Sequence, residues 1–331
     1  MKKILVTGGA GFVGAHTVLR LLENNFKVTS VDNLNSYYDV NLKIDRLNYI
    51  LEKSKKFKKN YVFFRGSIDN DIFIKKIFRA NFDYVINLAA QAGVRYSIEN
   101  PKNYMNSNVI GFFNILDACK NNKIKHLIFA STSSVYGLAK KFPISEKDDS
   151  SSPIQFYAAT KKANEVMAHA YSSIYKTPIT GLRFFTVYGP WDRPDMALQK
   201  FSDSIMNNKF IKLFNSGNHY RSYTYIDDVV DAIIKLVNHD FLKKDYKYKN
   251  FPYKIFNLGN SKTVSIKRVI KILSKNFNKK AKIRNLKLQK GDSLKTHAST
   301  NLLFKNLNFK PKVDIENGLS NFCKWYTDYY K

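Results

Sequence analysis

The sequence predicts a doubly wound α/β fold, a parallel sheet with helices on both faces. Three observations predict it. Short apolar stretches alternate with segments long enough for helices through the first 180 residues. A glycine cluster that starts at Gly8 directly follows the first of these stretches, and Asp32 ends the second. Such alternation favours a parallel sheet, because the connection between two parallel strands must cross back along the sheet, usually as a helix.

The expected strands of the first half follow one another in regular succession. The apolar runs place them at residues 3–7, 28–31, 61–64, 84–88, 127–130 and 179–185, with helical spacing at 13–22 and 106–120. The second half mixes smaller elements: a helix at 197–206, a strand at 209–214, a strand-to-helix unit at 225–237 and a helix at 319–330. We therefore expect one domain over residues 1–180, with returns to it near 226–237 and 255–258, and a smaller mixed α/β domain over 181–331.

The chain is strongly basic, but its charge is not patterned like a nucleic-acid-binding surface. The 55 Lys and Arg exceed the 26 Asp and Glu to give a net charge of +29, and 45 of the 55 are Lys spread along the whole chain. Surfaces that clamp phosphates or read bases favour the bidentate Arg. We therefore expect no nucleic-acid partner.

The sequence also predicts no membrane association, no metal site and no disulfide framework. It has no run of about 18 apolar residues, and Gly8 comes too early for the apolar core of a signal peptide. Cys119 and Cys323 lie far apart, and the six His residues show no ligand spacing. These features predict a cytoplasmic protein in a reducing compartment.

The glycine cluster has the spacing of a dinucleotide-binding turn. Gly8, Gly11 and Gly14 follow a strand and open a helix, so the backbone can approach a pyrophosphate and the helix N-terminus can supply amide donors. A carboxylate at Asp32 can accept the two hydroxyls of an adenosine ribose and would repel a 2′-phosphate. The first domain is therefore expected to be an NAD-binding Rossmann domain, with NAD favoured over NADP.

A tyrosine and a lysine supply the expected proton chemistry. Tyr157 and Lys161 are four residues apart, on one face of a helix. A phenol with a pKa of about 10 is a poor base, but a nearby Lys and a positive nicotinamide ring both favour the phenolate. The phenolate could take a proton from a substrate hydroxyl while hydride leaves the same carbon. Alone, the pair would be an aromatic and a surface Lys on an amphipathic helix.

A run of hydroxyl residues supports the catalytic interpretation. The strand at 127–130 leads into Ser131, Thr132, Ser133 and Ser134. The carboxyl end of a strand is where doubly wound proteins bind ligands. One of these hydroxyls can therefore hydrogen-bond the reacting oxygen.

The glycine loop, Asp32, the hydroxyl run and Tyr157/Lys161 together resemble the extended short-chain dehydrogenase/reductase superfamily of nucleotide-sugar epimerases and dehydratases. More narrowly, residues 33–39 (NLNSYYD), 89–97 (AAQAGVRYS) and 183–191 (RFFTVYGPW) are similar to UDP-glucuronate 4-epimerases. The resemblance spans nearly the whole chain. It implies a homodimeric NAD-dependent isomerase of polysaccharide biosynthesis, paired through the helices around 104–120 and 158–175.

The resemblance also implies the reaction and the catalytic residues. Tyr157 would be the base, Lys161 would hold the nicotinamide ribose and lower the pKa of Tyr157, and Thr132 would bind the sugar O4. Hydride would pass from C4 to NAD, the 4-keto sugar would turn over, and the hydride would return to its other face. UDP-glucuronate and UDP-galacturonate would thereby be interconverted.

The resemblance implies the remaining site residues as follows. Cofactor contacts are expected from Gly8, Gly11, Phe12, Val13, Asp32, Asn33, Asn35, Ser36, Ser67, Ile68, Leu88, Ala89, Ala90, Asn108, Tyr157 and Lys161. Substrate contacts are expected from Thr132, Ser133, Ser134, Thr186, Arg193, Arg221 and Asp292, most of which lie in the UDP-sugar-binding domain over 181–331. Arg221 would pair with phosphate, Asp292 would accept a ribose hydroxyl, and Arg193 would bind the sugar carboxylate or instead order its loop by an ion pair with Asp192 or Asp195.

Differences from related enzymes narrow the expected reaction. Ser133 and Ser134 stand where dehydratases of the superfamily have Asp-Glu, and Ser134 where UDP-glucuronate decarboxylases have Glu, so elimination and decarboxylation are disfavoured. Thr186 and Thr296 depart from the UDP-glucose epimerases, and Ser67 replaces a common adenine-binding Asp. The alternatives are a 4-epimerase of UDP-N-acetylglucosamine, its uronic acid or UDP-glucose, a decarboxylase or dehydratase, and a non-catalytic NAD- and RNA-binding protein.

Overall fold

The computed structural model describes residues 1–57, 60–239, 251–288 and 293–331, and the chain divides into two compact units. The first unit comprises residues 1–137, 149–183 and 230–256, and the second comprises 138–148, 184–229 and 257–331. The segment 138–148 therefore differs from the predicted division. It belongs to the second unit because Ile144 bridges Ala298 and its backbone hydrogen-bonds His297 and Ser299 at 2.7 and 2.8 Å.

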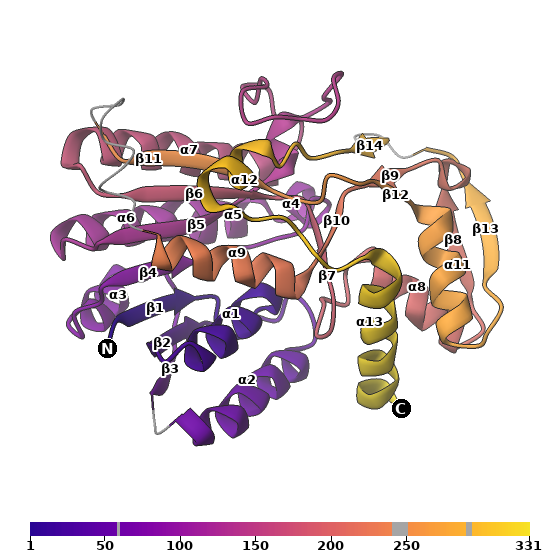
Figure 1. Ribbon diagram of the computed structural model, residues 1–331, viewed down its shortest axis with the longest axis horizontal. Coiled ribbons are helices and arrows are strands. Elements are labelled where there is room, and N and C mark those ends of the chain that lie inside the picture. The colour runs from indigo at the N-terminus through magenta and orange to yellow at the C-terminus, as the bar shows by residue number, and fades with distance from the viewer. Residues whose placement is uncertain (58–59, 240–250, 289–292) are drawn as a thin grey trace. The chain divides into compact units, whose positions relative to one another are not determined.

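Within the described residues, the first unit is built on a seven-stranded parallel sheet in the order β11-β6-β5-β4-β1-β2-β3 (Figure 1). Its strands are β1 (Lys3–Thr7), β2 (Lys27–Asp32), β3 (Tyr61–Arg65), β4 (Tyr84–Asn87), β5 (His126–Thr132), β6 (Ile179–Phe184) and β11 (Tyr253–Leu258). The chain runs outward from β1 to β3 and then restarts on the other side of β1 at β4. In open α/β sheets, ligands bind at the strand carboxyl ends beside such a reversal.

Helices cover both faces of this sheet, so the predicted fold class is confirmed (Figure 1). One layer contains α1 (Phe12–Glu23) and α2 (Val40–Ser54), and the other contains α3 (Asp71–Phe78), α6 (Gly111–Asn121) and α7 (Phe156–Tyr175). Leu5 of β1 packs in the core beneath the second layer. Its neighbours Ile4 and Val6, which point to the opposite face, are fully buried as well. Because strand side chains alternate between faces, both faces of the sheet are apolar and covered.

The remaining elements of the first unit connect or flank these layers. They are η1 (Lys55–Phe57), α4 (Tyr96–Glu99), α5 (Pro101–Tyr104), the π-helical η2 (Met105–Ile110), η3 (Ser133–Tyr136) and most of α9 (Ile226–Asn238). Asp231 of α9 forms an ion pair with Arg20 of α1. The expected return of the chain near 226–237 therefore packs beside α1.

The second unit consists of small sheets and helices. Its strands are β7 (Thr186–Tyr188), β8 (Phe210–Phe214), β9 (Tyr220–Arg221), β10 (Tyr223–Tyr225), β12 (Val264–Ser265), β13 (Lys282–Leu286) and β14 (Lys295–Thr296). Its helices are α8 (Ala197–Met206), η4 (Asn215–Gly217), α11 (Ile266–Asn276), α12 (Asn301–Leu307) and α13 (Ile315–Tyr330). The rings of Trp325 and Tyr329 on α13 contact Trp191, with centroids 5.5 and 5.0 Å apart, so α13 anchors the loop that follows β7.

Candidate active site

The chain leaves β1 in a turn whose backbone is too crowded for side chains. Gly8 has a φ of +72°, and a Cβ there would lie 2.7 Å from the amide nitrogen of Ala89. A Cβ at Gly14 would lie 1.9 Å from the carbonyl oxygen of Gly8. The turn therefore leads directly into the N-terminus of α1, where Phe12 and Val13 form the first turn. Amide donors and the helix dipole make such an N-terminus a site for a diphosphate.

The carboxylate of Asp32 lies beside this turn, as the sequence predicts for a ribose acceptor. Its two oxygens accept the backbone N–H groups of Ala10 at 3.1 Å and Leu34 at 2.9 Å. An ionised carboxylate has about four lone-pair sites, so two backbone donors leave room for the hydroxyls of a ribose. The glycine turn and Asp32 thus fit a dinucleotide with an unphosphorylated adenosine ribose.

The loop after β2 lies next to the loop after β3. Asn33 donates to the Ser67 hydroxyl at 3.3 Å and accepts from the amide of Asn35 at 3.1 Å. Ile68 is 4% exposed, whereas Ser36 is exposed. The structure therefore brings together Asn33, Asn35 and Ser67, three of the residues from which the resemblance implies cofactor contacts.

Two basic residues of α2 support these loops, and neither is among the residues that the sequence predicts for the site. Arg46 is 1% exposed and donates to the carbonyl of Ala10 at 3.1 Å and to the Tyr38 hydroxyl at 2.8 Å. Lys43 donates to the backbone and side-chain oxygens of Asn35 at 2.7 and 2.8 Å. Their i, i+3 spacing directly after the adenosine loop was the available signal, because it places both on one face of the helix.

The end of β4 and η2 contain the next predicted cofactor residues. The amides of Leu88 and Ala89 donate to the backbone oxygen and the hydroxyl of Thr7, both at 3.2 Å, and Ala90 follows. The side chain of Asn108, 1% exposed, accepts from the amide of Gln91 at 2.7 Å and donates to the Thr160 hydroxyl at 3.0 Å. Asn108 therefore connects the loop after β4 to α7, the helix of Tyr157.

The three predicted catalytic residues lie on α7 and at the end of β5. Lys161 is 2% exposed, and its ammonium donates to the carbonyl of Ala130 at 3.0 Å. Burial lowers the pKa of Lys161 to about 8. Tyr157 is one helical turn earlier and packs edge-on against Tyr104, with ring centroids 6.1 Å apart. Thr132 ends β5, where its hydroxyl accepts the amide of Ser134 at 3.2 Å.

Ser133 and Ser134 begin η3, directly after Thr132, and both are partly exposed. Neither side chain has a carboxyl group, so Thr132, Ser133 and Ser134 present hydroxyl groups alone. Ser131, which precedes Thr132, donates through its hydroxyl to Glu165 of α7 at 2.7 Å. Glu165 was also missed by the sequence analysis, although it continues the four-residue spacing from Tyr157 through Lys161.

The described substrate residues predicted in the second unit form hydrogen bonds within that unit. Thr186 begins β7, and its amide donates to the carbonyl of Ser222 at 3.2 Å. Arg193 pairs with both carboxylate oxygens of Asp195 at 3.0 and 2.8 Å, so the loop ion pair that the sequence left open is present and Asp195 is its partner. Arg221 on β9 donates to the carbonyl of Ser293 at 2.7 Å. Asp292 lies outside the described residues.

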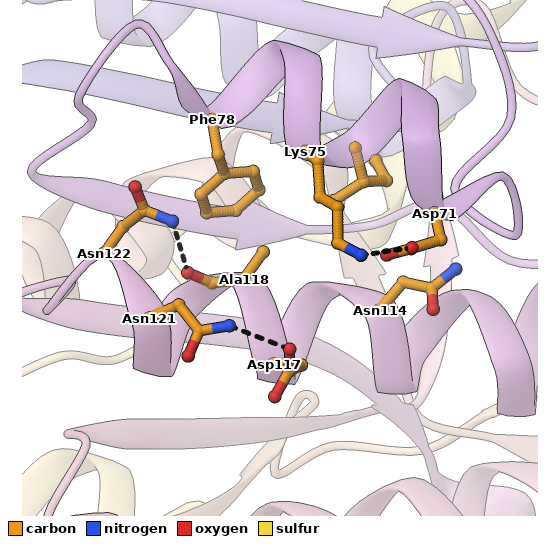
Figure 2. Close-up of a pocket in the computed structure, with 9 residues that line it drawn as sticks. Asp71, Lys75, Phe78, Asn114, Asp117, Ala118, Asn121 and Asn122 are labelled. Carbon is orange, nitrogen blue, oxygen red and sulfur yellow. Dashed lines mark hydrogen bonds and ion pairs between the residues drawn. The ribbon is translucent and has the colours of Figure 1, made fainter.

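A hollow between α3 and α6 contains none of the predicted site residues among the described residues that line it (Figure 2). Lys75 pairs with Asp71 at 2.6 Å, and Asn121 donates to Asp117 at 2.9 Å. Asn114 and Asn122 donate instead to the backbone carbonyls of Ile68 and Ala118. In the described part of the chain, no cluster of His, Cys, Asp or Glu suits a metal ion, and none of the helices has the length and apolarity to cross a bilayer.

The fold, the glycine turn, Asp32 and the Tyr157/Lys161 pair define an NAD-dependent enzyme with a doubly wound cofactor domain. The profile of the NAD dependent epimerase/dehydratase family matches residues 4–259. The chain therefore belongs to the NAD-dependent epimerase/dehydratase family, and NAD is its cofactor.

Relatives and solved structures resemble the chain over almost its full length. Protein CapI of Staphylococcus aureus is 44% identical, with 99% of each chain covered. UDP-glucuronate 4-epimerase 4 of Arabidopsis thaliana is 43% identical over 99% of this chain and 76% of its own. The crystal structure of UDP-glucuronic acid 4-epimerase from Bacillus cereus, in complex with UDP-glucuronic acid and NAD, has a TM-score of 0.89 at 31% identity and covers 98% of this chain and 99% of that chain.

Proposed function

We propose that the protein is a UDP-glucuronate 4-epimerase, which interconverts UDP-glucuronate and UDP-galacturonate through a 4-keto sugar. The observation that carries the proposal is the arrangement at the end of β5. There the buried Lys161 binds the carbonyl of Ala130, and the hydroxyls of Thr132, Ser133 and Ser134 come two to four residues later. The full-length similarity to proteins named UDP-glucuronate 4-epimerase supports the same assignment.

The reaction requires a base, a positioned cation and a hydrogen-bond partner for the sugar O4. Tyr157 accepts the O4 proton, and Lys161 holds the cofactor ribose and favours the Tyr157 phenolate by its positive charge. Thr132 hydrogen-bonds O4. Bound NAD supplies a hydride acceptor for C4 and later returns the hydride. Tyr157 gives its proton back to O4 after the ketone has turned its other face, so no net oxidation occurs.

A further set of residues is proposed to bind NAD and to position it for the reaction. The turn from Gly8 to Gly14 would receive the diphosphate, and Asp32 would accept the adenosine ribose hydroxyls, by the geometry described above. Asn33, Asn35 and Ser67 would contact the adenosine, while Leu88, Ala89, Ala90 and Asn108 would line the nicotinamide half. Each of these assignments rests on the position of the residue in the first unit and on the family pattern.

Substrate selection is proposed to rest on the predicted substrate residues. Ser133 and Ser134 lack the carboxylates that would remove water from the sugar, so epimerisation is favoured over elimination. Arg193 would exchange its pairing with Asp195 for the uronate carboxylate, with which a guanidinium can form the same paired hydrogen bonds. Thr186 would contribute its hydroxyl. Arg221 and Asp292 would bind the diphosphate and ribose of UDP.

We further propose a homodimer formed through α6 and α7, in which the second copy covers exposed apolar side chains. Phe113 on α6 is 47% exposed, and Val166 and Ile174 on α7 are 59% and 68% exposed. Exposed apolar patches often mark interfaces between proteins. In a two-fold symmetric dimer, the same face of each subunit contacts that face of the other.

The experiment that tests the activity uses purified protein and UDP-glucuronate without added NAD, followed by proton NMR of the anomeric region. UDP-galacturonate should form, and Tyr157→Phe should abolish it. UDP-xylose or a 4-keto pentose would mean that decarboxylation proceeds despite Ser134. If nothing forms even after NAD is supplied, UDP-N-acetylglucosamine, its uronic acid and UDP-glucose are the substrates to try next. If all three fail, the protein should be tested for salt-sensitive binding to RNA.

A further inference from the structure

A buried ion pair lies one helical turn beyond Lys161. Glu165 and Arg183 are 3% and 4% exposed. The guanidinium donates through Nε and Nη2 to the two carboxylate oxygens, each at 2.7 Å. Such bidentate pairs fix both side chains, and a buried carboxylate that loses its partner is costly. Glu165 is therefore a rigid acceptor inside the first unit.

This carboxylate also receives a hydrogen bond from β5. The Ser131 hydroxyl, 2% exposed, donates to Glu165 at 2.7 Å. Burial acts to raise the pKa of Glu165, but the hydrogen bond and charge of Arg183, with the Ser131 bond, lower it below its ordinary value. An ionised carboxylate can only accept hydrogen bonds. The proton of Ser131 therefore points towards α7.

Successive turns of α7 thus hold successive residues of β5. Tyr157, Lys161 and Glu165 are spaced by four residues and share one face of the helix. Lys161 binds the carbonyl of Ala130, and Glu165 binds the side chain of Ser131. The pairing of β5 with β4 ends at Phe129, and these two bonds hold the next two residues of β5 against α7. Thr132 is the next residue.

The far end of the network contacts a different segment. Arg183 donates to the Ser150 hydroxyl at 3.2 Å, and Lys162 donates to the same hydroxyl at 2.8 Å. Ser150 is 8% exposed. Ser131 and Ser150 are therefore two buried hydroxyls bound to one ion pair, of which Ser131 alone adjoins Thr132.

We propose that Ser131 and Glu165 are positioning residues of the epimerase: Glu165, fixed by Arg183, holds Ser131 and thereby sets the Thr132 hydroxyl for the sugar O4. The proposal rests on the proposed function, because it takes Thr132 as the residue that binds O4. It assigns a role in the reaction to an ion pair whose two residues are not among the predicted substrate or cofactor contacts.

The test compares Ser131→Ala with the matched control Ser150→Ala, both measured with their bound NAD on the UDP-sugar that the wild type epimerises. Ser131→Ala should lower kcat by about tenfold or more with KM changed less than about twofold, since small misplacements of catalytic groups cost this much. Ser150→Ala should leave both constants within about twofold of the wild type, because its loss does not reach Thr132. Equal losses of kcat in the two variants would overturn the proposal.

A double-mutant cycle separates positioning from a general loss of stability. If Ser131 acts through Thr132, Ser131→Ala should cost almost nothing further in a Thr132→Ala background, because coupled residues are not additive. Fully additive losses would contradict the proposal. Hydrogen exchange of the amides at 130–134 needs no turnover, so it tests the geometry even if no UDP-sugar is a substrate: faster exchange is expected in Ser131→Ala and not in Ser150→Ala, and unchanged exchange in both would refute the proposal.

Discussion

The ammonium of Lys161 is bound to the carbonyl oxygen of Ala130 at 3.0 Å, inside the first unit and two residues before Thr132. This bond joins α7, the helix of Tyr157, to the end of β5. Because the amine is buried, its protonation is linked to folding, and the link has a defined direction.

The free energy of unfolding of the NAD-free protein should rise with pH between about 8 and 10.5 because of Lys161. Burial lowers the pKa of Lys161 from 10.5 to about 8, so in this window the unfolded chain binds a proton that the folded chain has released. Stability then increases with pH, by at most about 1.4 kcal/mol per pH unit. Urea unfolding at pH 7.5 and 9.5 measures it. Lys161→Met should lose this increment, whereas Lys200→Met, at an exposed position of α8, should keep it; equal pH dependence in all three proteins would contradict the prediction.

Gly14→Ala should destabilise the protein more than Gly11→Ala. The added Cβ would lie 1.9 Å from the Gly8 carbonyl oxygen in the first case and 3.0 Å from it in the second. The backbone must move for Gly14→Ala, at a cost of about 1–3 kcal/mol. Thermal unfolding of the NAD-free proteins, followed by NAD titration, should show the larger losses for Gly14→Ala. A reversed order would mean that the turn relaxes more easily than its geometry indicates.

Asp32→Asn should weaken NAD binding and reduce the discrimination against NADP. The amide keeps one acceptor for a backbone N–H but loses the negative charge and an acceptor for ribose hydroxyls. Loss of hydrogen bonds to a charged group costs about 1.5–3 kcal/mol, roughly 10- to 100-fold in affinity. Binding of both cofactors to NAD-stripped protein measures the ratio. The same NAD/NADP ratio in variant and wild type would place the ribose away from Asp32.

Arg193→Ala should raise KM for UDP-glucuronate by about tenfold or more, because it removes a paired hydrogen bond to the uronate. A neutral UDP-hexose lacks that carboxylate, so any activity on it should change little. Asp195→Asn is the matched control: it breaks the ion pair within the loop and leaves the guanidinium in place. If Asp195→Asn and Arg193→Ala have the same effect on both substrates, the role of Arg193 is to order its loop.

Phe113→Glu should convert a dimer into a monomer. The substitution places a charge on α6 at a side chain that is 47% exposed, where a second copy would otherwise bury it. Light scattering after size exclusion should give twice the chain mass of 38.3 kDa for the wild type and the single mass for the variant. Phe210→Glu, at a residue of β8 that is 62% exposed, should remain dimeric. A wild-type monomer would rule out this interface.

The sequence predicts the parts of the fold that depend on local pattern. Apolar runs place β1 to β6 within a few residues, and the glycine spacing places the turn that precedes α1. The residues that support the site are less visible, because their partners are distant in the chain. Glu165 and Arg46 each occupy helix positions where a charged residue normally faces solvent, and only the packing of α7 and α2 shows that both are buried.

The place of the segment 138–148 is not predicted by the sequence, for a similar reason. The segment 138–148 has no strong apolar period. It joins the second unit through a bridge of Ile144 to Ala298 and through hydrogen bonds of Asn257 to Ile144 and Glu146. Contacts between residues more than 100 positions apart have no local signature. Site residues that belong to a recurring motif are therefore predictable, whereas attachments made by a few distant residues are not.

The strand order has a consequence for the newly made chain. β6 is completed at residue 184, but its outer neighbour β11 ends only at residue 258, after the segment 184–229 has been added to the second unit. At about 5–20 residues per second, a ribosome needs several seconds to cover this gap. Throughout that interval β6 is an apolar sheet edge that can pair with another nascent chain. Expression yield should therefore depend on translation speed between these strands, and a fragment that stops at residue 183 should aggregate.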